Sequence, residues 1–337
     1  MGEDNNIPLD SCDLGIAYQC MLECKMCHFW HKSQLSEDNI LSIESWKTVL
    51  KNISQLKRTD NFMINIGGPG EPFLRKGIFE LISTGRKLGL PIQVITNGFI
   101  VDKGIVEKID ESGLSFLCFS LDSLDPQIHD FLRGKKGVQE KLMKTIDLVA
   151  QECKQIKIGI NNVISKVNLA GIIDVINWAE NDPKISYINF QAIAQPFSYT
   201  EALNLEWFKS DKYKFLWPDD EKSINEIMDS IIALKNKNFK IANSITQLNV
   251  FRKYFLNPEE FIKNSRCNLG RGNVLVIDPA GNVSMCQLVG IIDRINKEKS
   301  LFEIIASDKT KLHKKNINAC RRNCHLIVSC YYQDETN

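Results

Sequence analysis

Short β-branched segments alternate with amphipathic helical segments from about residue 40 to residue 195, and this alternation constrains the fold more than any other feature of the chain. Apolar residues recur at helical spacing in 43–56, 77–88, 102–112, 137–152 and 169–180. Strand-like runs lie between them at 63–66, 93–96, 116–122, 156–164 and 185–193. Strands that alternate with helices form a parallel sheet, so we expect an α/β protein. With a first strand before Cys20 there are about six βα units, which favours an open, partial barrel over a closed eight-stranded one.

Eleven cysteines in a chain of 337 residues are the second informative feature. The first residues, MGEDNNIPLD, are acidic and lack an apolar signal core, and no later stretch has 18 uninterrupted apolar residues. We therefore expect a cytoplasmic protein without a membrane partner, in which clustered cysteines bind metal rather than form disulfides. The net charge of +1 gives no reason to expect nucleic acid as a partner.

Three of the cysteines stand close together after the first expected strand. Cys20, Cys24 and Cys27 have the spacing C-x3-C-x2-C, which lets three thiolates converge and leaves one iron of a [4Fe-4S] cluster open to an outside ligand. A structural zinc site with His28 as the fourth ligand is the alternative, but the usual two pairs of ligands are absent. The loop is therefore a candidate for chemistry at an incompletely ligated cluster.

This loop resembles the cluster-binding loop of the radical S-adenosylmethionine (radical SAM) superfamily. The resemblance implies a partial (β/α)6 barrel over residues 10–195, a [4Fe-4S] cluster held by the three cysteines, and SAM chelated to the open iron. It also implies reductive cleavage of SAM to a 5′-deoxyadenosyl radical, which abstracts a hydrogen atom from the substrate. Met26 stands where the family usually has an aromatic residue, and this departure concerns the adenine contact rather than the cluster.

Further family-like motifs follow the expected strands, at the edge of the sheet where α/β proteins bind ligands. Residues 67–72, GGPGEP, resemble the family's GGEP segment, whose exposed backbone binds the SAM amino group. Arg133 resembles the arginine that pairs with the SAM carboxylate. The expected SAM-binding residues are Gly67, Gly68, Glu71, Asn97, Ser120 and Arg133. A turn or capping role is the alternative for the residues at the strand ends, and we interpret Asp122 as structural.

A second group of cysteines lies near the end of the chain, and a hairpin is expected at 273–286 with Gly281 in its turn. The group consists of Cys267, Cys286, Cys320, Cys324 and Cys330. It resembles the SPASM and twitch auxiliary-cluster domains, here over 265–337, and implies one auxiliary [4Fe-4S] cluster with one cysteine to spare. A zinc ribbon is the alternative. Segment 291–324 has nine Lys or Arg against four Asp or Glu. This positive charge either raises the reduction potential of the cluster, or docks a redox partner, or is solvated surface without a role.

Residues 196–264 carry no motif that we can place, and we expect a linker and helical segment there. Its aromatic and acidic residues either line a substrate mouth or serve as packing and helix-capping residues. They are Tyr199, Trp207, Trp217, Asp219 and Asp220.

The distribution of the other thiols bears on the reaction. A radical epimerase needs a cysteine to return a hydrogen atom, yet none lies between Cys153 and Cys267, and we interpret Cys118 as a packed core residue. We therefore expect oxidation of the substrate radical through the auxiliary cluster, by dehydrogenation or cross-linking, in preference to epimerisation. The resemblance implies a ribosomal peptide or a sugar- or aminoglycoside-type molecule as substrate, with flavodoxin or ferredoxin as electron donor. A non-catalytic iron–sulfur carrier or scaffold is the alternative of another class.

Overall fold

A single sheet of nine strands organises the part of the chain that the computed structural model describes, which is residues 8–27, 29, 40–196, 204, 206–264, 274–286 and 288–320. Its strand order is β6-β5-β4-β3-β2-β1-β7-β8-β9. The first six strands are all parallel to their neighbours. They are β1 Leu9–Gly15, β2 Arg58–Gly67, β3 Ile92–Thr96, β4 Phe116–Ser120, β5 Lys157–Ile164 and β6 Ile185–Ala192. The expected α/β class and the six-unit parallel sheet are confirmed.

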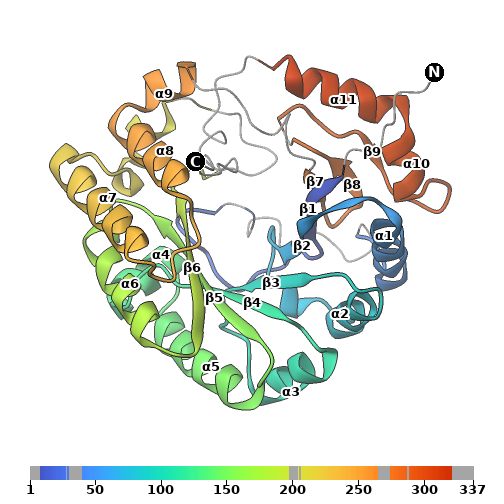
Figure 1. Cartoon of the computed structure of the whole chain (residues 1–337), viewed down its shortest axis with the longest axis horizontal. Helices are drawn as coiled ribbons and strands as arrows, with labels where there is room; N and C mark the ends of the chain where they lie inside the picture. Colours follow the sequence, from blue (N-terminus) through green and yellow to red (C-terminus); the bar gives the residue numbers. More distant parts are fainter. Residues whose placement is uncertain are drawn as a thin grey trace.

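Helices follow the strands in sequence and cover the outer side of the curved sheet (Figure 1). They are α1 Ile43–Gln55, α2 Ile78–Lys87, α3 Lys103–Ser112, α4 Pro126–Arg133, α5 Val138–Glu152 and α6 Ile172–Asn181. Side-chain caps fix several starts: Ser42 accepts from the Ser45 amide and Asp102 from the Ile105 amide. The sequence analysis did not anticipate α4, which is short but strongly delimited by Asp125 at its N-cap and Gly134, at φ +72°, at its C-cap.

The core lies between the helices and the outer face of the sheet. Along β2, Phe62, Ile64 and Ile66 are buried and alternate with less buried residues, as expected for a strand with one face against helices. The buried side chains of the strands point toward the helices. Ile92 of β3 shows this, because a Cβ added to Gly85 of α2 would lie 2.2 Å from its side chain. The alternate residues of each strand therefore point to the concave, inner side of the sheet.

Residues 206–264 continue beyond β6 and form α7 Glu221–Asn236, α8 Ile245–Leu256 and α9 Pro258–Asn264. Trp207 and Trp217 are buried, with their ring centroids 5.6 Å apart, and Trp217 also contacts Tyr254 of α8. Asp220 caps α7 by accepting from the Ser223 amide. The packing and capping interpretation is thus confirmed for Trp207, Trp217 and Asp220. Asp219 has neither role, because its exposed carboxylate pairs with Lys166 at 2.5 Å. Tyr199 lies outside the described residues.

The C-terminal strands extend the barrel sheet past β1. The expected hairpin is confirmed: β7 Val274–Ile277 and β8 Asn282–Ser284 are antiparallel around Gly281, whose φ is +86°. However, β7 also pairs in parallel with β1, and β9 Asp293–Arg294 ends the sheet. The strands on the two sides of the boundary expected at residue 265 therefore belong to one sheet. Without β7, β1 would have an unpaired edge.

Helices α10 Leu301–Ala306 and α11 Asp308–Asn318 lie at the β9 end of the molecule, on the opposite side from α7 and α8 (Figure 1). Among the described helices, none has the length and apolar character that a membrane span requires.

Candidate active site

The three-cysteine loop begins five residues after β1, and the segment that leads into it, Ile16 to Tyr18, is buried. Burial is the main reason that the pKa of Cys20 is raised to about 11 and that of Cys24 to about 12. Cys27 raises both values further, so the three thiols lie near one another. Because thiols must be deprotonated to bind metal, loading this site releases protons.

The three thiols do not lie close enough together to hold a single metal ion. In the described part of the chain, no three His, Cys, Asp or Glu side chains meet as a single metal ion requires. A [4Fe-4S] cluster takes each thiolate at a different iron and does not need them to meet at one point. That Cys20, Cys24 and Cys27 each bind one iron of such a cluster stays a prediction.

The glycine-rich loop after β2 contacts the cysteine loop directly. The Glu71 amide donates to the Gln19 carbonyl at 2.7 Å, one residue before Cys20. A Cβ on Gly70 would lie 2.5 Å from that same oxygen and 2.7 Å from the Ala17 carbonyl, so only glycine permits this approach. Gly68, in contrast, has nothing within 4 Å of an added Cβ, so its backbone is open on that side. The contact of Gly67 and Gly68 with SAM stays a prediction.

The Glu71 carboxylate is occupied within the protein. It accepts from the Thr96 hydroxyl at 2.7 Å, the Asn97 amide at 3.0 Å and the Phe73 amide at 3.3 Å. Burial raises its pKa, while these hydrogen bonds oppose the shift. Glu71 thus joins the ends of β2 and β3.

Asn97 and Ser120 differ in their surroundings. Asn97 Nδ2 lies 3.9 Å from Cys20 Sγ and 3.7 Å from Met21 Sδ, so the amide faces the cysteine loop. Ser120 ends β4 and is partly exposed, and its side chain has no hydrogen bond within the described part of the chain. Both positions are at the carboxyl edge of the sheet, as expected, and their SAM contacts stay predictions.

Arg133, at the end of α4, supports the cysteine loop from the other side. Its Nε lies 2.8 Å from Asp122 Oδ2, and its charge opposes the rise in the pKa of the Cys24 thiol. The Lys25 amide donates to the Leu132 carbonyl at 2.8 Å, and a Cβ on Gly134 would meet the Glu23 carbonyl at 2.3 Å. In this structure the guanidinium therefore pairs with Asp122 beside the cysteine loop, and its expected contact with the SAM carboxylate stays a prediction.

His129 is a site residue that the sequence analysis missed. It is fully buried, and its Nδ1 accepts from the Asp122 amide at 3.2 Å. Burial, and then the charge of Arg133, lower its pKa to about 4, so the ring is neutral at pH 7. The helix signals Asp125, Pro126 and Gly134 could have located α4 and with it this histidine.

Polar side chains cross the concave face of the sheet below the cysteine loop. Tyr187 donates to Gln93 at 2.5 Å, Gln93 to Asn65 at 3.3 Å, and Asn65 to Asp13 at 2.9 Å. The Tyr187 ring lies over Gly159, where a Cβ would meet it at 2.1 Å.

Cys118 lies next to Tyr187, at one end of this series of hydrogen-bonded side chains. Its thiol lies beside the Tyr187 hydroxyl, and burial raises its pKa to about 12. Cys118 is 2% exposed, so it is packed as predicted, but its neighbour is a polar group on the inner face.

The structure describes only part of the second cysteine group. Cys286 follows β8 and Cys320 follows α11, and both are partly exposed. Cys267, Cys324 and Cys330 lie outside the described residues. The auxiliary cluster and its ligands therefore stay predictions.

A parallel, partial (β/α) barrel with a three-thiol loop after its first strand defines a class of metal-cluster enzymes. Residues 15–179 match the family model of the Radical SAM superfamily. The chain therefore contains a radical SAM domain, as the resemblance implied, and this superfamily uses a [4Fe-4S] cluster and SAM.

Two curated relatives match about half of the chain. Fe-coproporphyrin III synthase of Methanosarcina barkeri is 29% identical over 171 residues, or 50% of this chain and 41% of the relative. The sporulation killing factor maturation protein SkfB of Bacillus subtilis is 29% identical over 178 residues, or 53% of this chain and 41% of the relative. The chain thus matches less than half the length of these relatives.

A solved structure matches the fold over nearly all of the chain. Streptococcus suis SuiB, bound to the precursor peptide SuiA, has a TM-score of 0.69 at 18% identity, and the match covers 98% of this chain and 72% of SuiB. The likeness in fold therefore extends beyond the radical SAM domain.

Proposed function

We propose that the protein cleaves SAM reductively at a cluster held by Cys20, Cys24 and Cys27 and uses the resulting radical to oxidise a ribosomal peptide. The observation that carries the proposal is the three-thiol loop, which Gly70 approaches on one side and Gly134 on the other. Such contacts hold a loop in one conformation without side chains that would compete for the iron. A non-catalytic iron–sulfur carrier would not need this arrangement at the carboxyl edge of a parallel sheet.

The chain's own residues have distinct roles in this proposal. When bound, the cluster and SAM supply an electron and a hydrogen-abstracting radical. The open backbone at Gly67 and Gly68 would bind the SAM amino group, and Ser120 and Asn97 would contact SAM from the ends of β4 and β3. Glu71 is a positioning residue, because its carboxylate holds the Asn97 amide at 3.0 Å. Arg133 would act on the cysteine loop, on SAM, or on both.

The inner face of the sheet suits a polar substrate such as a peptide. Asn189 donates to Asn161 at 2.9 Å, and both residues are partly exposed on the concave face, in register with Ser120. Amide side chains can both donate to and accept from a peptide backbone. The names of two matched proteins support a peptide: SkfB is a maturation protein for a killing factor, and SuiB was solved with a precursor peptide.

The proposed outcome is oxidation. The substrate loses one hydrogen atom to the radical, and then one proton and one electron, so the product is lighter by two hydrogens and carries a new double bond or cross-link. The electron would leave toward the C-terminal cysteines, of which Cys286 and Cys320 are described. In domain terms, 10–195 would generate the radical, 196–264 would flank the substrate and 265–337 would hold the auxiliary cluster.

The proposal is tested with the anaerobically reconstituted full chain, SAM, dithionite and candidate precursor peptides encoded near its gene. We expect 5′-deoxyadenosine and a peptide product lighter by two hydrogens, detected by mass spectrometry. Cys24→Ala should abolish both, whereas Cys153→Ala, a buried cysteine outside the site, should retain both.

Two results would contradict the proposal. A reconstituted protein that neither binds nor cleaves SAM would indicate a carrier or scaffold. A product of unchanged mass in ordinary water that gains one deuterium in heavy water would indicate epimerisation, and Cys118 would then be the first thiol to replace.

A further inference from the structure

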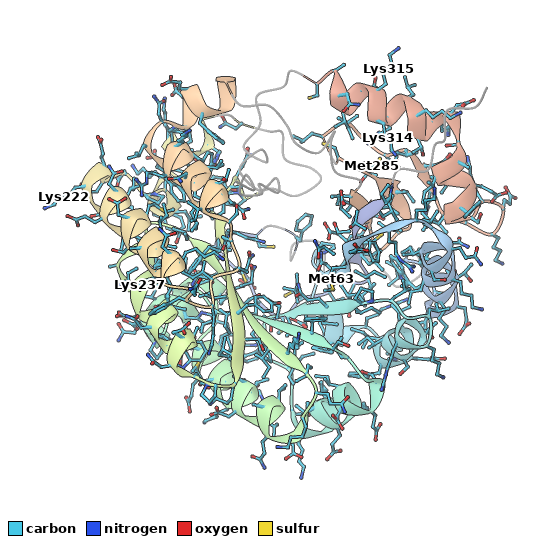
Figure 2. All side chains as sticks on the ribbon, in the orientation of Figure 1. Met63, Lys222, Lys237, Met285, Lys314 and Lys315 are labelled. Atoms are coloured by element: carbon cyan, nitrogen blue, oxygen red, sulfur yellow. The ribbon has the colours of Figure 1, made fainter. Side chains whose placement is uncertain are left out.

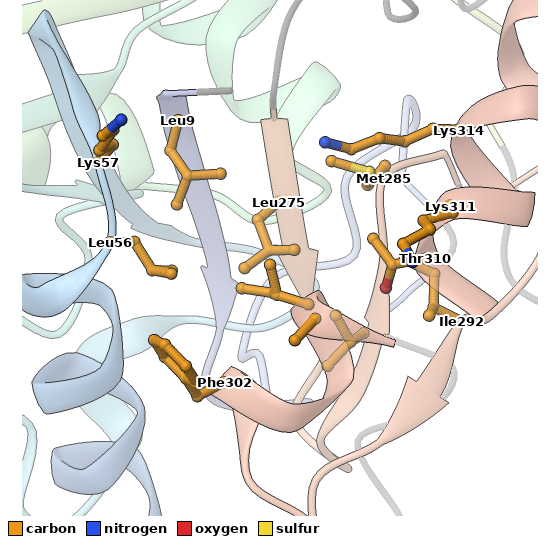
Figure 3. Close-up of a pocket in the computed structure, with 13 residues that line it drawn as sticks. Leu9, Leu56, Lys57, Leu275, Met285, Ile292, Phe302, Thr310, Lys311 and Lys314 are labelled. Carbon is orange, nitrogen blue, oxygen red and sulfur yellow. The ribbon is translucent and has the colours of Figure 1, made fainter. Parts of the chain in front are cut away.

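An apolar pocket lies outside the proposed active site, between the outer side of β1, β7 and β8 and the helices α10 and α11 (Figure 3). Its volume is about 330 Å³. Leu9, Leu275, Met285 and Phe302 form much of its wall. Helices cover the corresponding outer face of the sheet from β2 to β6, whereas at this end the cover is incomplete.

All charged residues that line this pocket are lysines: Lys57, Lys311 and Lys314. Lys314 is partly buried, and burial lowers its pKa. Neither Lys57 nor Lys314 has an ion pair within the described part of the chain, whereas Lys311 pairs with Asp308 at 2.8 Å. An apolar pocket bordered by lysines and by no acid favours an anionic partner with an apolar side chain at its contact surface.

The surface around the pocket has the same mixed character. Helix α11 buries Thr310, His313 and Ile317, so its outward face carries Lys311, Leu312 and Lys315. Three of the five exposed large apolar residues of the described chain lie in this region: Ile291 at 62%, Phe302 at 48% and Leu312 at 57%. Lysines outnumber acids on α10 and α11, where Lys309, Lys311, Lys314 and Lys315 stand against Glu303 and Asp308. Exposed apolar groups beside such a positive balance of charge mark a site of protein–protein contact.

This surface adjoins the second cysteine group. His313 Nε2 accepts from the Met285 amide at 3.4 Å, which joins the buried side of α11 to the pocket wall. Cys286 is the next residue after Met285. Cys320 lies just after α11, and its amide donates to the Ile317 carbonyl of that helix at 3.0 Å. A protein seated on α11 would thus be close to two candidate cluster ligands.

We infer that the surface formed by α10, α11 and the adjoining pocket docks a small acidic electron-transfer protein, whose apolar side chain enters the pocket while its carboxylates meet Lys311, Lys314 and Lys315. This inference rests on the proposed function, since it assigns the entry point of the electron that SAM cleavage consumes. One electron passes from the reduced carrier to the enzyme, and the carrier is oxidised by one electron with no proton transferred. The balance of positive charge suits a transient, electrostatically steered complex.

The test compares two double charge reversals in the reconstituted full chain. Lys311→Glu/Lys315→Glu alters the proposed surface. Lys222→Glu/Lys237→Glu makes the same change of charge at the two ends of α7, at the other side of the molecule (Figure 2). SAM cleavage is measured with a reduced acidic flavodoxin as the electron source and, separately, with dithionite. Binding of oxidised flavodoxin is measured by titration.

We expect Lys311→Glu/Lys315→Glu to lose at least about tenfold in flavodoxin-dependent kcat/KM and in flavodoxin affinity, with a dithionite-driven rate within about twofold of the parent. Lys222→Glu/Lys237→Glu should match the parent in every measurement. Added salt should slow the flavodoxin-driven reaction of the parent and have little effect on the reversed variant.

An unchanged flavodoxin affinity in Lys311→Glu/Lys315→Glu would overturn the inference. So would an equal loss of peptide modification under dithionite, which would assign the surface to the peptide instead. If the parent binds flavodoxin through these lysines but cleaves no SAM with dithionite, the docking surface stands and the proposed function fails.

Discussion

Arg133 Nε lies 2.8 Å from Asp122 Oδ2, in a position where both side chains are almost entirely enclosed. Asp122 Oδ1 accepts from the Val163 amide at 3.2 Å, and the charge of Arg133 acts on the Cys24 thiol, opposing the rise in its pKa. One buried ion pair therefore links the end of β4, helix α4 and the cysteine loop. Breaking such a pair on one side leaves an uncompensated charge, which costs far more than the pair itself contributes.

Replacement of Arg133 by Met is expected to destabilise the metal-free protein by about 3–5 kcal/mol, because the Asp122 carboxylate stays buried without a counter-charge. The free energy of unfolding would be measured by urea denaturation. Arg133→Met/Asp122→Asn is the control, since Asn removes the charge and keeps an oxygen for the Val163 amide. This double variant should lose less stability than Arg133→Met alone, and an equal or greater loss would contradict the buried-pair argument.

His129 predicts a pH dependence of stability. Its pKa is about 4 in the folded protein against about 6.5 in an unfolded chain, so the unfolded state binds more protons between these values. Stability should therefore fall as the pH drops through this window, by about 2 kcal/mol between pH 7 and pH 5. Urea denaturation of the metal-free protein at the two pH values measures this.

His129→Gln is the matched variant, because its side chain can still accept from the Asp122 amide but does not titrate. It should lose about 2 kcal/mol less than the parent over the same pH interval. If both proteins lose the same amount, another group is responsible for the acid sensitivity.

Local sequence patterns predict most of the barrel. The strand and helix periodicities place β3 to β6 and helices α1, α2, α3, α5 and α6 within a few residues, but they miss α4 and the first five residues of β2. The cysteine spacing identifies the loop. Both signals depend only on neighbours in sequence. The parallel pairing of β7 with β1 has no such signal. It joins Ser11 to Val274, more than 260 residues away, and depends on the exposed edge of β1.

The orientation of polar side chains at the strand ends is similarly beyond the sequence. Glu71 belongs to a recognisable motif, yet its carboxylate bonds Thr96 and Asn97, which is decided by the three-dimensional packing of two loops. Asp122 was expected to be structural, and its pairing with Arg133 agrees with that. The sequence did not indicate the pairing, because each residue could have paired with many other residues of opposite charge.

The cysteine groups predict a specific iron content. Two clusters of four irons give about eight irons per reconstituted chain, measured by colorimetric assay and Mössbauer spectroscopy. The variant with Cys20, Cys24 and Cys27 all replaced by Ala should keep about four irons and lose all SAM cleavage. Zinc in place of the retained iron after anaerobic isolation would favour the zinc ribbon, and about twelve irons in the parent would show a third cluster.

The contact at Gly70 predicts a contrast with its neighbour. Gly70→Ala places a Cβ 2.5 Å from the Gln19 carbonyl and 2.7 Å from that of Ala17, and backbone oxygens cannot rotate away as a side chain would. The cysteine loop must move, so the variant should incorporate less iron at the Cys20–Cys27 loop and unfold more easily, by about 1–3 kcal/mol. Gly68→Ala, where nothing lies within 4 Å of the added Cβ, should keep the parent's iron content and stability.

Iron content and stability are the appropriate measurements for this pair, since a methyl group at Gly68 could still obstruct SAM and lower activity by itself. We therefore expect Gly68→Ala to retain the full cluster even if its SAM affinity falls. Gly70→Ala should have less cluster iron even when SAM is not added. Equal iron content in the two variants would show that the glycine-rich loop does not position the cysteines.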